Sequence, residues 1–231
     1  MGETKRIVVA IDGPAGAGKS TIARRIAEKL GFLYIDTGAM YRAVGLWALR
    51  LGVGLSDMHR LEQLAREARI ELEPGNSRVL LNGEDITEAI RTQDISNAAS
   101  KASLIPGVRR AMVEKQRQMS VRTSVVMEGR DIGTVVFPDA AVKIFLDADP
   151  DVRAGRRLRE IQEKGEAAQP AEIAREIRER DQRDRTRAEA PLVQAPDAVY
   201  VDSTARTVDE VEETILKIVR ERTSNGKDFA H

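Results

Sequence analysis

The 231-residue sequence predicts an α/β fold, in which helices cover a central parallel sheet, and the alternation of two kinds of segment supports this prediction. Short β-branched segments alternate with longer segments whose apolar residues recur at helical spacing, which is the pattern of parallel strands joined by helices. The first such pair shows both features, since residues 7–11 read Ile-Val-Val-Ala-Ile and residues 22–30 place Ile22, Ile26 and Leu30 on one helical face. In folds of this kind, ligands bind at the carboxyl ends of the strands.

A glycine-rich segment joins these two elements. Gly13 to Ser20 reads Gly-Pro-Ala-Gly-Ala-Gly-Lys-Ser, a complete phosphate-binding loop set between a strand and a helix. Glycines let backbone N–H groups face a triphosphate, and the helix N-terminus adds a positive field. Lys19 adds a mobile charge, and Ser20 offers a hydroxyl to Mg²⁺. The alternative interpretation is an ordinary glycine turn. The loop predicts a nucleoside triphosphate ligand and the three-layer fold of P-loop NTPases.

The remaining elements follow in order along the chain. The pair Asn82-Gly83 lies between two extended segments, which is a hairpin signal, so residues 70–86 are expected to form a small antiparallel sheet. The other expected elements are strands at 32–35, 125–127, 142–146 and 198–201, and helices at 39–51, 58–68, 94–103, 108–119, 150–164, 170–187 and 207–222.

Capping residues mark two of these helix starts. Asp149 followed by Pro150 is a favourable N-cap and first helical residue, and it opens an arginine-rich helix. Thr207 with Glu210 forms a capping box and opens the final helix.

The length favours one domain that carries an insertion and a mobile lobe. The antiparallel sheet at 70–86 interrupts the α/β alternation, and the polar tip at 165–170 separates two arginine-rich helices. We therefore expect a single domain over 1–231, with a core at about 1–55, 95–152 and 190–222, an insertion at about 56–94, a helical lid at about 153–187 and a flexible tail at 223–231.

Composition excludes several classes of function. The 37 basic and 37 acidic side chains cancel, and aromatic residues make up 3% of the chain, so neither a nucleic acid nor an anionic membrane surface is expected as a partner. No stretch approaches the roughly 20 apolar residues of a membrane span. The chain has no cysteine and only two histidines, His59 and His231, which disfavours zinc sites and histidine catalysis. Without an apolar segment at its start, we expect a cytoplasmic protein, and a monomer is compatible with the zero net charge.

Three further charged segments narrow the chemistry. They are 36–42 (Asp-Thr-Gly-Ala-Met-Tyr-Arg), 128–134 (Glu-Gly-Arg-Asp-Ile-Gly-Thr) and 179–187 (Glu-Arg-Asp-Gln-Arg-Asp-Arg-Thr-Arg). The first places Arg42 one helical turn beyond a strand end. The third places Arg180, Asp184 and Arg187 on one helical face, at i, i+4 and i+7. Each has a plain alternative: the Arg-Asp pair at 130–131 could be a local salt bridge, and the third segment a solvated face.

The phosphate loop favours a functional interpretation of these arginines. Phosphoryl transfer depends on cations gathered around the transferring group and on the exclusion of water. Guanidinium groups match phosphate oxygens better than ammonium groups do. The helical hairpin at 153–187 would supply such cations from a lid that closes over the reacting groups.

Taken together, the segments resemble bacterial cytidylate kinases. The resemblance rests on Ile-Asp-Gly-Pro-Ala-Gly-Ala-Gly-Lys-Ser, Asp-Thr-Gly-Ala-Met-Tyr-Arg, Glu-Gly-Arg-Asp-Ile-Gly-Thr-Val-Val-Phe-Pro and Arg-Asp-Gln-Arg-Asp-Arg-Thr-Arg, and it runs from residue 7 to about 220. It implies transfer of the γ-phosphoryl group of ATP to CMP or dCMP with Mg²⁺. It also implies that the insertion around 70–86 is the enlarged monophosphate-binding region of the bacterial enzymes. Ala15 departs from the serine that many family loops carry.

The resemblance also implies roles for individual residues. Lys19, Arg130 and Arg187 would be catalytic, and Ser20 would contact Mg²⁺. ATP would be bound by Asp12, Gly13, Pro14, Ala15, Gly16, Ala17, Gly18, Lys19, Ser20, Thr21 and Arg157. The acceptor would be bound by Thr37, Arg42, Ser100, Arg109, Arg130, Asp131, Arg180, Asp184 and Arg187. Of these, Arg42, Arg130 and Arg187 would contact its phosphate, Ser100, Arg109 and Asp131 its base, and Arg180 and Asp184 its sugar.

Three rival functions stay open from the sequence. Another small-molecule kinase of this architecture, of the UMP/CMP, adenylate or shikimate type, would differ in its acceptor. A nucleotide-gated switch would be expected to carry an Asn-Lys-x-Asp motif, which does not occur here. A nucleic-acid-binding ATPase would need a basic or aromatic-lined surface.

Overall fold

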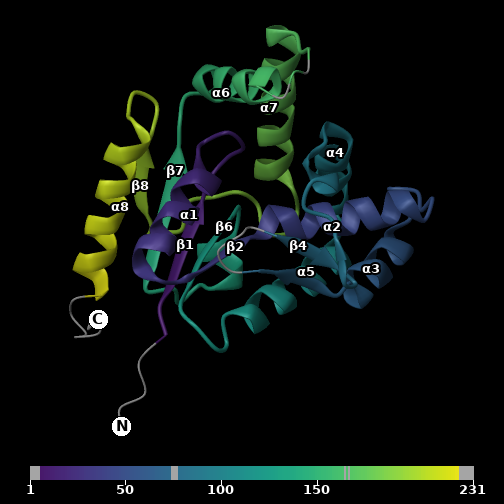
Figure 1. Ribbon diagram of the computed structural model, residues 1–231, viewed down its shortest axis with the longest axis horizontal. Helices are drawn as coiled ribbons and strands as arrows, with labels where there is room; N and C mark the ends of the chain where they lie inside the picture. Colours follow the sequence, from purple (N-terminus) through teal and green to yellow (C-terminus); the bar gives the residue numbers. More distant parts are fainter. Residues whose placement is uncertain (1–5, 74–77, 164, 166, 224–231) are drawn as a thin grey trace. The chain divides into compact units, whose positions relative to one another are not determined.

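The computed structural model describes residues 6–73, 78–163, 165 and 167–223 (Figure 1). Its contacts divide the chain into two units, a first unit of residues 1–32 and 124–231 and a second unit of residues 33–123. The tail predicted at 223–231 lies, from residue 224 onward, outside the described residues. Among the described helices, none is long and apolar enough to cross a membrane.

A parallel sheet forms the centre of the fold, as predicted. Five strands lie in the order β2-β6-β1-β7-β8. Their bounds are β1 (Val8–Asp12), β2 (Leu33–Asp36), β6 (Val125–Gly129), β7 (Val142–Asp147) and β8 (Val199–Asp202). Strand β1 pairs in parallel with β6 on one side and β7 on the other, so that Val9 lies opposite both Val126 and Val142. These three valines are fully buried, as expected for strands covered on both faces.

Helices of the first unit pack on this sheet and beyond its carboxyl ends. Helices α1 (Lys19–Leu30) and α8 (Val208–Thr223) contact each other, and they contact β6 and β7 respectively. Helices α6 (Pro150–Glu163) and α7 (Pro170–Thr186) form a contacting pair that follows β7 (Figure 1). A π-helical turn, η2 (Ile132–Val136), follows β6 and had no counterpart among the expected elements.

The predicted caps of this unit are confirmed. The Asp149 carboxylate accepts hydrogen bonds from the backbone N–H groups of Asp151 and Val152 at the start of α6. At the start of α8, the Thr207 hydroxyl accepts from the N–H of Glu210, and the Glu210 carboxylate accepts from the N–H of Thr207. Reciprocal bonds of this kind satisfy N–H groups that have no partner within the helix.

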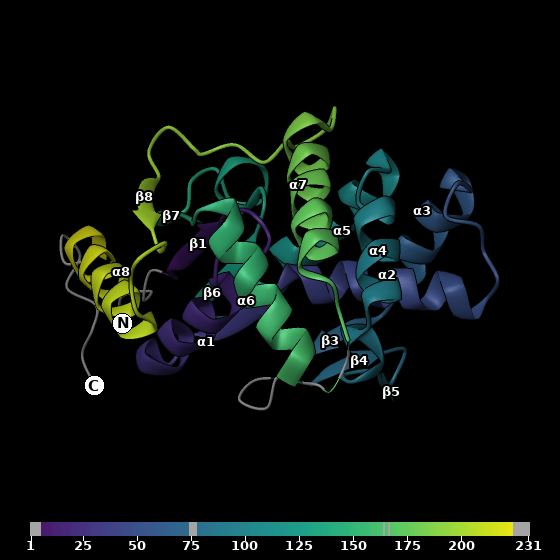
Figure 2. The same cartoon turned by 90° about the horizontal axis from the view of Figure 1, so that it is seen from above.

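The second unit combines helices with the small antiparallel sheet. Its elements after β2 are α2 (Thr37–Arg50), α3 (Met58–Glu67), β3 (Ile70–Leu72), β4 (Val79–Leu81), β5 (Glu84–Asp85), η1 (Ala89–Arg91), α4 (Gln93–Ala102) and α5 (Pro106–Met119). The sheet has the order β3-β4-β5 and is antiparallel (Figure 2). Asn82 and Gly83 have φ values of 52° and 87°, which confirms the predicted turn.

A buried carboxylate joins α1 to α8. The Glu212 side chain is 1% exposed, and it forms ion pairs with Arg25 and Lys29, whose side chains are 39% and 54% exposed. Taking a carboxylate out of water is costly unless cations compensate the charge. The two partners reach Glu212 from the surface, so each of them remains partly solvated.

Because Glu212 is buried and its two partners are partly exposed, we expect mutations on the two sides of these ion pairs to lower the free energy of unfolding by different amounts. The double variant Arg25→Met/Lys29→Met leaves the Glu212 carboxylate buried without its cations, and we expect it to lower the free energy of unfolding by about 3 kcal/mol. Glu212→Gln leaves only partly solvated cations behind and should cost less. Urea unfolding at neutral pH measures both, and a larger loss in Glu212→Gln than in the double variant would contradict this account.

Candidate active site

The phosphate loop follows β1, and its glycines are required by close backbone contacts. Gly13 has φ 150°, and a Cβ atom there would lie 1.9 Å from the carbonyl oxygen of Leu146 in β7. Gly16 has φ 75°, and its Cβ would lie 3.1 Å from the Cβ of Arg153. A side chain at Gly13 would therefore displace the end of β7, and one at Gly16 would be strained in the left-handed region.

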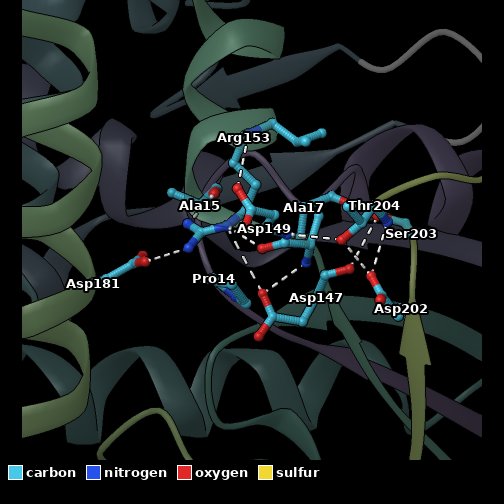
Figure 3. A network of polar contacts seen from close by, with 12 residues as sticks. Pro14, Ala15, Ala17, Asp147, Asp149, Arg153, Asp181, Asp202, Ser203 and Thr204 are labelled. Carbon is cyan, nitrogen blue, oxygen red and sulfur yellow. Dashed lines mark hydrogen bonds and ion pairs between the residues drawn. The ribbon is translucent and has the colours of Figure 1, made fainter. Parts of the chain in front are cut away.

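Three carbonyl oxygens of this loop accept hydrogen bonds from side chains. The Lys19 ammonium donates to Pro14 O at 2.6 Å. The Arg153 guanidinium donates to Ala15 O at 3.0 Å, and the Ser203 hydroxyl donates to Ala17 O at 3.1 Å (Figure 3). These bonds fix the orientation of successive peptide groups, which is what a loop needs if its N–H groups are to face phosphate oxygens.

Lys19, the first residue of α1, has an unusual ionisation. It is buried and begins a helix whose N-cap is Gly18. Burial, together with the positive charge of Arg130, lowers the pKa of Lys19 to about 7. A negatively charged ligand at this position would favour the ammonium form again.

Asp12, the last residue of β1, holds the π-helical turn η2. Its two carboxylate oxygens accept from the backbone N–H groups of Ile132, at 2.8 Å, and Gly133, at 2.7 Å. Burial raises the pKa of Asp12 to about 6, because these two bonds only partly offset the loss of water. The Asp12 side chain therefore fixes the segment that begins with Arg130 and Asp131.

Two arginines converge on one buried aspartate. Arg130 follows β6, and its Nε donates to Asp184 Oδ2 in α7 at 2.8 Å. Arg187 Nη1 lies 3.9 Å from the other oxygen of Asp184, and Arg187 Nη2 lies 3.5 Å from Asp131 Oδ1. The side chains of Asp131, Asp184 and Arg187 are less than a tenth exposed. The structure thus brings together four of the residues predicted from the sequence.

These groups keep one another charged. Burial opposes the charge on Arg130, but the Asp184 carboxylate outweighs it and raises the pKa of this guanidinium. Burial likewise favours a neutral Asp184, yet the charges of Arg130 and Arg180 together hold the pKa of its carboxyl below the usual value. A buried ion-pair network of this kind is pre-organised for anion binding because its cations are already fixed.

The predicted helical face is only partly right. Helix α7 ends at Thr186, and Arg187 has an extended backbone conformation with ψ 143°, so it lies just beyond the helix. Its guanidinium reaches Asp184 nevertheless, and its Nε donates to Ala190 O at 2.6 Å. Other charges in this segment are exposed, among them Glu179 and Arg183, whose side chains are 57% and 39% exposed, which fits the alternative of a solvated face for that side of α7.

The second unit carries the other predicted acceptor residues. Asp36 caps α2 through the N–H of Ala39 and forms an ion pair with Arg42 at 2.9 Å. Thr37 is the buried first residue of α2.

Ser100 and Arg109 of the second unit lie on α4 and α5. Both are buried. Arg109 donates to Ser103 O at 3.3 Å and lies over the ring of Tyr41, with 5.8 Å to the ring centroid. The Ser100 hydroxyl is buried and lacks a hydrogen-bond partner among the described residues. A buried hydroxyl without a partner is costly, which is typical of a group that awaits a ligand.

The remaining predicted residues are more exposed. Ser20 and Thr21 lie exposed in the first turn of α1, and Arg157 of α6 is half-buried and paired with Glu160 at 3.1 Å. The described part of the chain contains no group of three or more side chains that could hold a metal ion by themselves.

Sequence reasoning missed Arg153 and Asp181. Arg153 is 1% exposed and is among the largest fully buried side chains. It bonds both the phosphate loop and Asp181 of α7. Four arginines lie between residues 153 and 159, and no local signal separates the buried one from its neighbours. Its contacts with Ala15 and Asp181, which lie 138 and 28 positions away in the sequence, are what distinguish it.

Comparison with known proteins identifies relatives over nearly the whole chain. The cytidylate kinase family model matches residues 9–221. A cytidylate kinase from Solibacter usitatus is 67% identical over 228 residues, which cover 98% of this chain and 97% of that protein. A cytidylate kinase from Pelotomaculum thermopropionicum is 50% identical over 222 residues, which cover 95% and 96% of the two chains.

A solved structure shares the fold. The structure of a gluconokinase from Sinorhizobium meliloti 1021 matches with a TM-score of 0.52 and 16% identity, and the match covers 98% of this chain and all of that one. The likeness supports the α/β fold alone. The family match and the identity to curated relatives confirm the resemblance noted in the sequence, and the chain belongs to the cytidylate kinase family.

Proposed function

We propose that the protein transfers the γ-phosphoryl group of ATP to CMP and to dCMP, which gives ADP with CDP or dCDP. An oxygen of the acceptor monophosphate attacks the γ-phosphorus, and the bond between this phosphorus and the β–γ bridging oxygen breaks, so that ADP leaves. One observation carries this proposal beyond family membership: Arg130 and Arg187 converge on buried Asp184, and Arg130 lies close enough to influence the ionisation of Lys19.

We assign the donor to the phosphate loop, residues 12–21, with Arg157 as a further contact. In this assignment Lys19 exchanges its bond to Pro14 O for phosphate oxygens, and its charge offsets the charge that develops on the leaving ADP. Ser20 is exposed at the same helix start, which suits a hydroxyl that contacts a phosphate-bound Mg²⁺. The metal would neutralise charge on the phosphates and orient them.

We assign the acceptor phosphate to Arg42, Arg130 and Arg187. Each is paired with a carboxylate in the structure, which holds its guanidinium in place before ligand binding. We assign the sugar to Arg180 and Asp184. Because phosphoryl transfer has little covalent chemistry for the protein to perform, the positions and charges of these groups supply the rate enhancement.

We assign the base to Ser100, Arg109 and Asp131. A carboxylate accepts hydrogen bonds only, so Asp131 suits the exocyclic amine of cytosine. Ser100 and Arg109 can donate to the ring nitrogen and carbonyl. Uracil would present a carbonyl oxygen to the carboxylate of Asp131, and two acceptors facing each other in a closed site are costly.

We further propose that the enzyme acts as a monomer in the cytoplasm. All residues assigned to the donor and the acceptor come from one chain. Both substrates are nucleotides that cytoplasmic metabolism supplies.

The first test is acceptor selectivity. ADP release from ATP should depend on Mg²⁺ and should occur with CMP and dCMP, whereas UMP should react at least about a hundredfold less efficiently. AMP, GMP and shikimate should give no turnover. A coupled ADP assay with each acceptor in turn makes the measurement, and equal turnover of UMP and CMP would reject the base assignment.

A second test concerns Lys19. Free Lys19 is largely neutral above pH 7, because burial lowers its pKa to about 7, and a bound triphosphate favours its charged form. ATP binding should therefore take up a proton between pH 7 and 8, and the affinity for ATP should weaken as pH rises through this range.

Calorimetry in buffers of different ionisation enthalpy measures this uptake. In Lys19→Arg the side chain is always charged, so its contribution to the uptake should vanish. Lys217→Met, which changes an exposed lysine of α8, is the matched control and should behave as wild type. Equal proton uptake by the wild type and Lys19→Arg would contradict the assignment.

A third test concerns Asp131. Asp131→Asn offers a donor as well as an acceptor, so we expect the ratio of kcat/KM for CMP to that for UMP to fall by about tenfold or more. Asp139→Asn removes an exposed carboxylate from the loop that follows η2 and should leave the ratio unchanged. Steady-state kinetics with both acceptors gives the ratio, and an unaltered ratio in Asp131→Asn would show that another group reads the base.

A further inference from the structure

Arg153 is a cation enclosed by the first unit. It lies in the first turn of α6 and is 1% exposed. Its Nε donates to Ala148 O at 2.9 Å, its Nη1 to Ala15 O at 3.0 Å and its Nη2 to Asp181 Oδ2 at 2.6 Å (Figure 3). Each nitrogen of the guanidinium thus has its own partner, and the three partners belong to three different segments. A lysine could not reproduce this planar arrangement.

Asp181 is a residue of α7, so its bond to Arg153 connects this helix to the phosphate loop. Its carboxylate is 9% exposed, and its other oxygen, Oδ1, has no hydrogen-bond partner among the described residues. The charge of Asp181 is therefore compensated through Arg153. Arg180 is the preceding residue and Asp184 lies one helical turn further on, so Asp181 belongs to the same part of α7 as both of them.

An apolar contact joins the same partners. The methyl group of Ala15 belongs to a buried cluster with Ala154 and Ile161 of α6 and Ile173 and Ile177 of α7. The carbonyl of Ala15 accepts a hydrogen bond from Arg153, and its side chain belongs to a buried cluster that includes residues of both helices. The phosphate loop and the α6–α7 pair are thus held together by polar and apolar interactions at a single residue.

A second ion pair between these helices offers a contrast. Arg178 of α7 lies 3.4 Å from Asp151 of α6, but the two side chains are 66% and 81% exposed, and neither contacts the loop. An exposed pair of this kind contributes little. The buried pair of Arg153 and Asp181 differs from this exposed pair because Arg153 also donates a hydrogen bond to Ala15 O in the phosphate loop. Its contacts therefore do more than join α6 to α7.

We propose that Arg153 and Asp181 are positioning residues that couple occupancy of the phosphate loop to the acceptor-binding side chains of α7. A triphosphate bound at the loop acts on the peptide group of Ala15, and this effect reaches Arg153 and, through Asp181, the turn of α7 that carries Arg180 and Asp184. Coupling between two sites is reciprocal, so each ligand tightens the binding of the other by the same factor. This inference rests on the proposed function, because it takes ATP and CMP as the two ligands.

The test measures the affinity for CMP by calorimetry with and without a non-hydrolysable β,γ-imido analogue of ATP and Mg²⁺. In the wild type, the analogue should tighten CMP binding by about fivefold or more. In Asp181→Asn, which preserves the size of the side chain but not its charge, this factor should fall toward one. Arg178→Gln is the matched control and should retain the wild-type factor.

The factor by which the ATP analogue tightens CMP binding, here called the coupling factor, distinguishes a positioning role of Asp181 from a merely structural one. A structural role would lower the melting temperature of Asp181→Asn and leave the factor unchanged, and that result would overturn the inference, as would a wild type without coupling. If Asp181→Asn does not fold, Arg153→Lys, which keeps the positive charge, carries the same test. Failure of the wild type to phosphorylate CMP would reject the proposed function, whereas CMP turnover with unchanged coupling in the variant would reject this inference alone.

Discussion

The hydrogen bonds that side chains donate to the carbonyl oxygens of the phosphate loop are the interactions on which the first unit depends. Lys19 bonds Pro14 O, Arg153 bonds Ala15 O and Ser203 bonds Ala17 O, so the loop is fixed by α1, by α6 and by the segment after β8. A loop without regular secondary structure must satisfy its peptide groups elsewhere. Here the carbonyl groups are satisfied by protein side chains, an arrangement that suits a loop whose N–H groups serve a ligand.

The buried charges next to this loop form a balanced network. Arg130 and Arg187 share Asp184, while Arg187 also lies near Asp131. Isolated, any of these ions would be too costly to bury, and the expected response would be neutralisation. Lys19 shows this response, because its pKa falls to about 7, whereas the arginines cannot lose their protons and are held by carboxylates instead. The cost of burying a charge therefore has two results in one site: Lys19 can lose its proton near neutral pH, whereas Arg130 and Arg187 stay charged beside carboxylates.

Local patterns predicted the elements, but not the contacts between them. The hairpin at Asn82 and the capping box at Thr207 depend on residues within a few positions, and both were correctly predicted. The bond from Asp12 to Ile132 spans 120 residues, and that from Arg153 to Asp181 spans 28. The sequence around a charged residue in a helix does not show which distant residue will pair with it in the folded protein. The resemblance to a known family supplied the residues that we propose contact the ligands, but not Arg153 and Asp181, which we propose act through other side chains.

The alanine at position 15 shows how one residue can satisfy two constraints. Its side chain lies in an apolar cluster with Ile173 and Ile177, where a serine hydroxyl would have to find a partner or lose its hydration. Its carbonyl oxygen, in contrast, is bound by a buried guanidinium. Any rotation of the peptide group after Ala15 would break the polar contact, and any shift of its Cβ would disturb the apolar one. The loop in this chain therefore cannot change its backbone at position 15 without moving α6 and α7, and the departure from serine is consistent with the isoleucines that these two helices present to it.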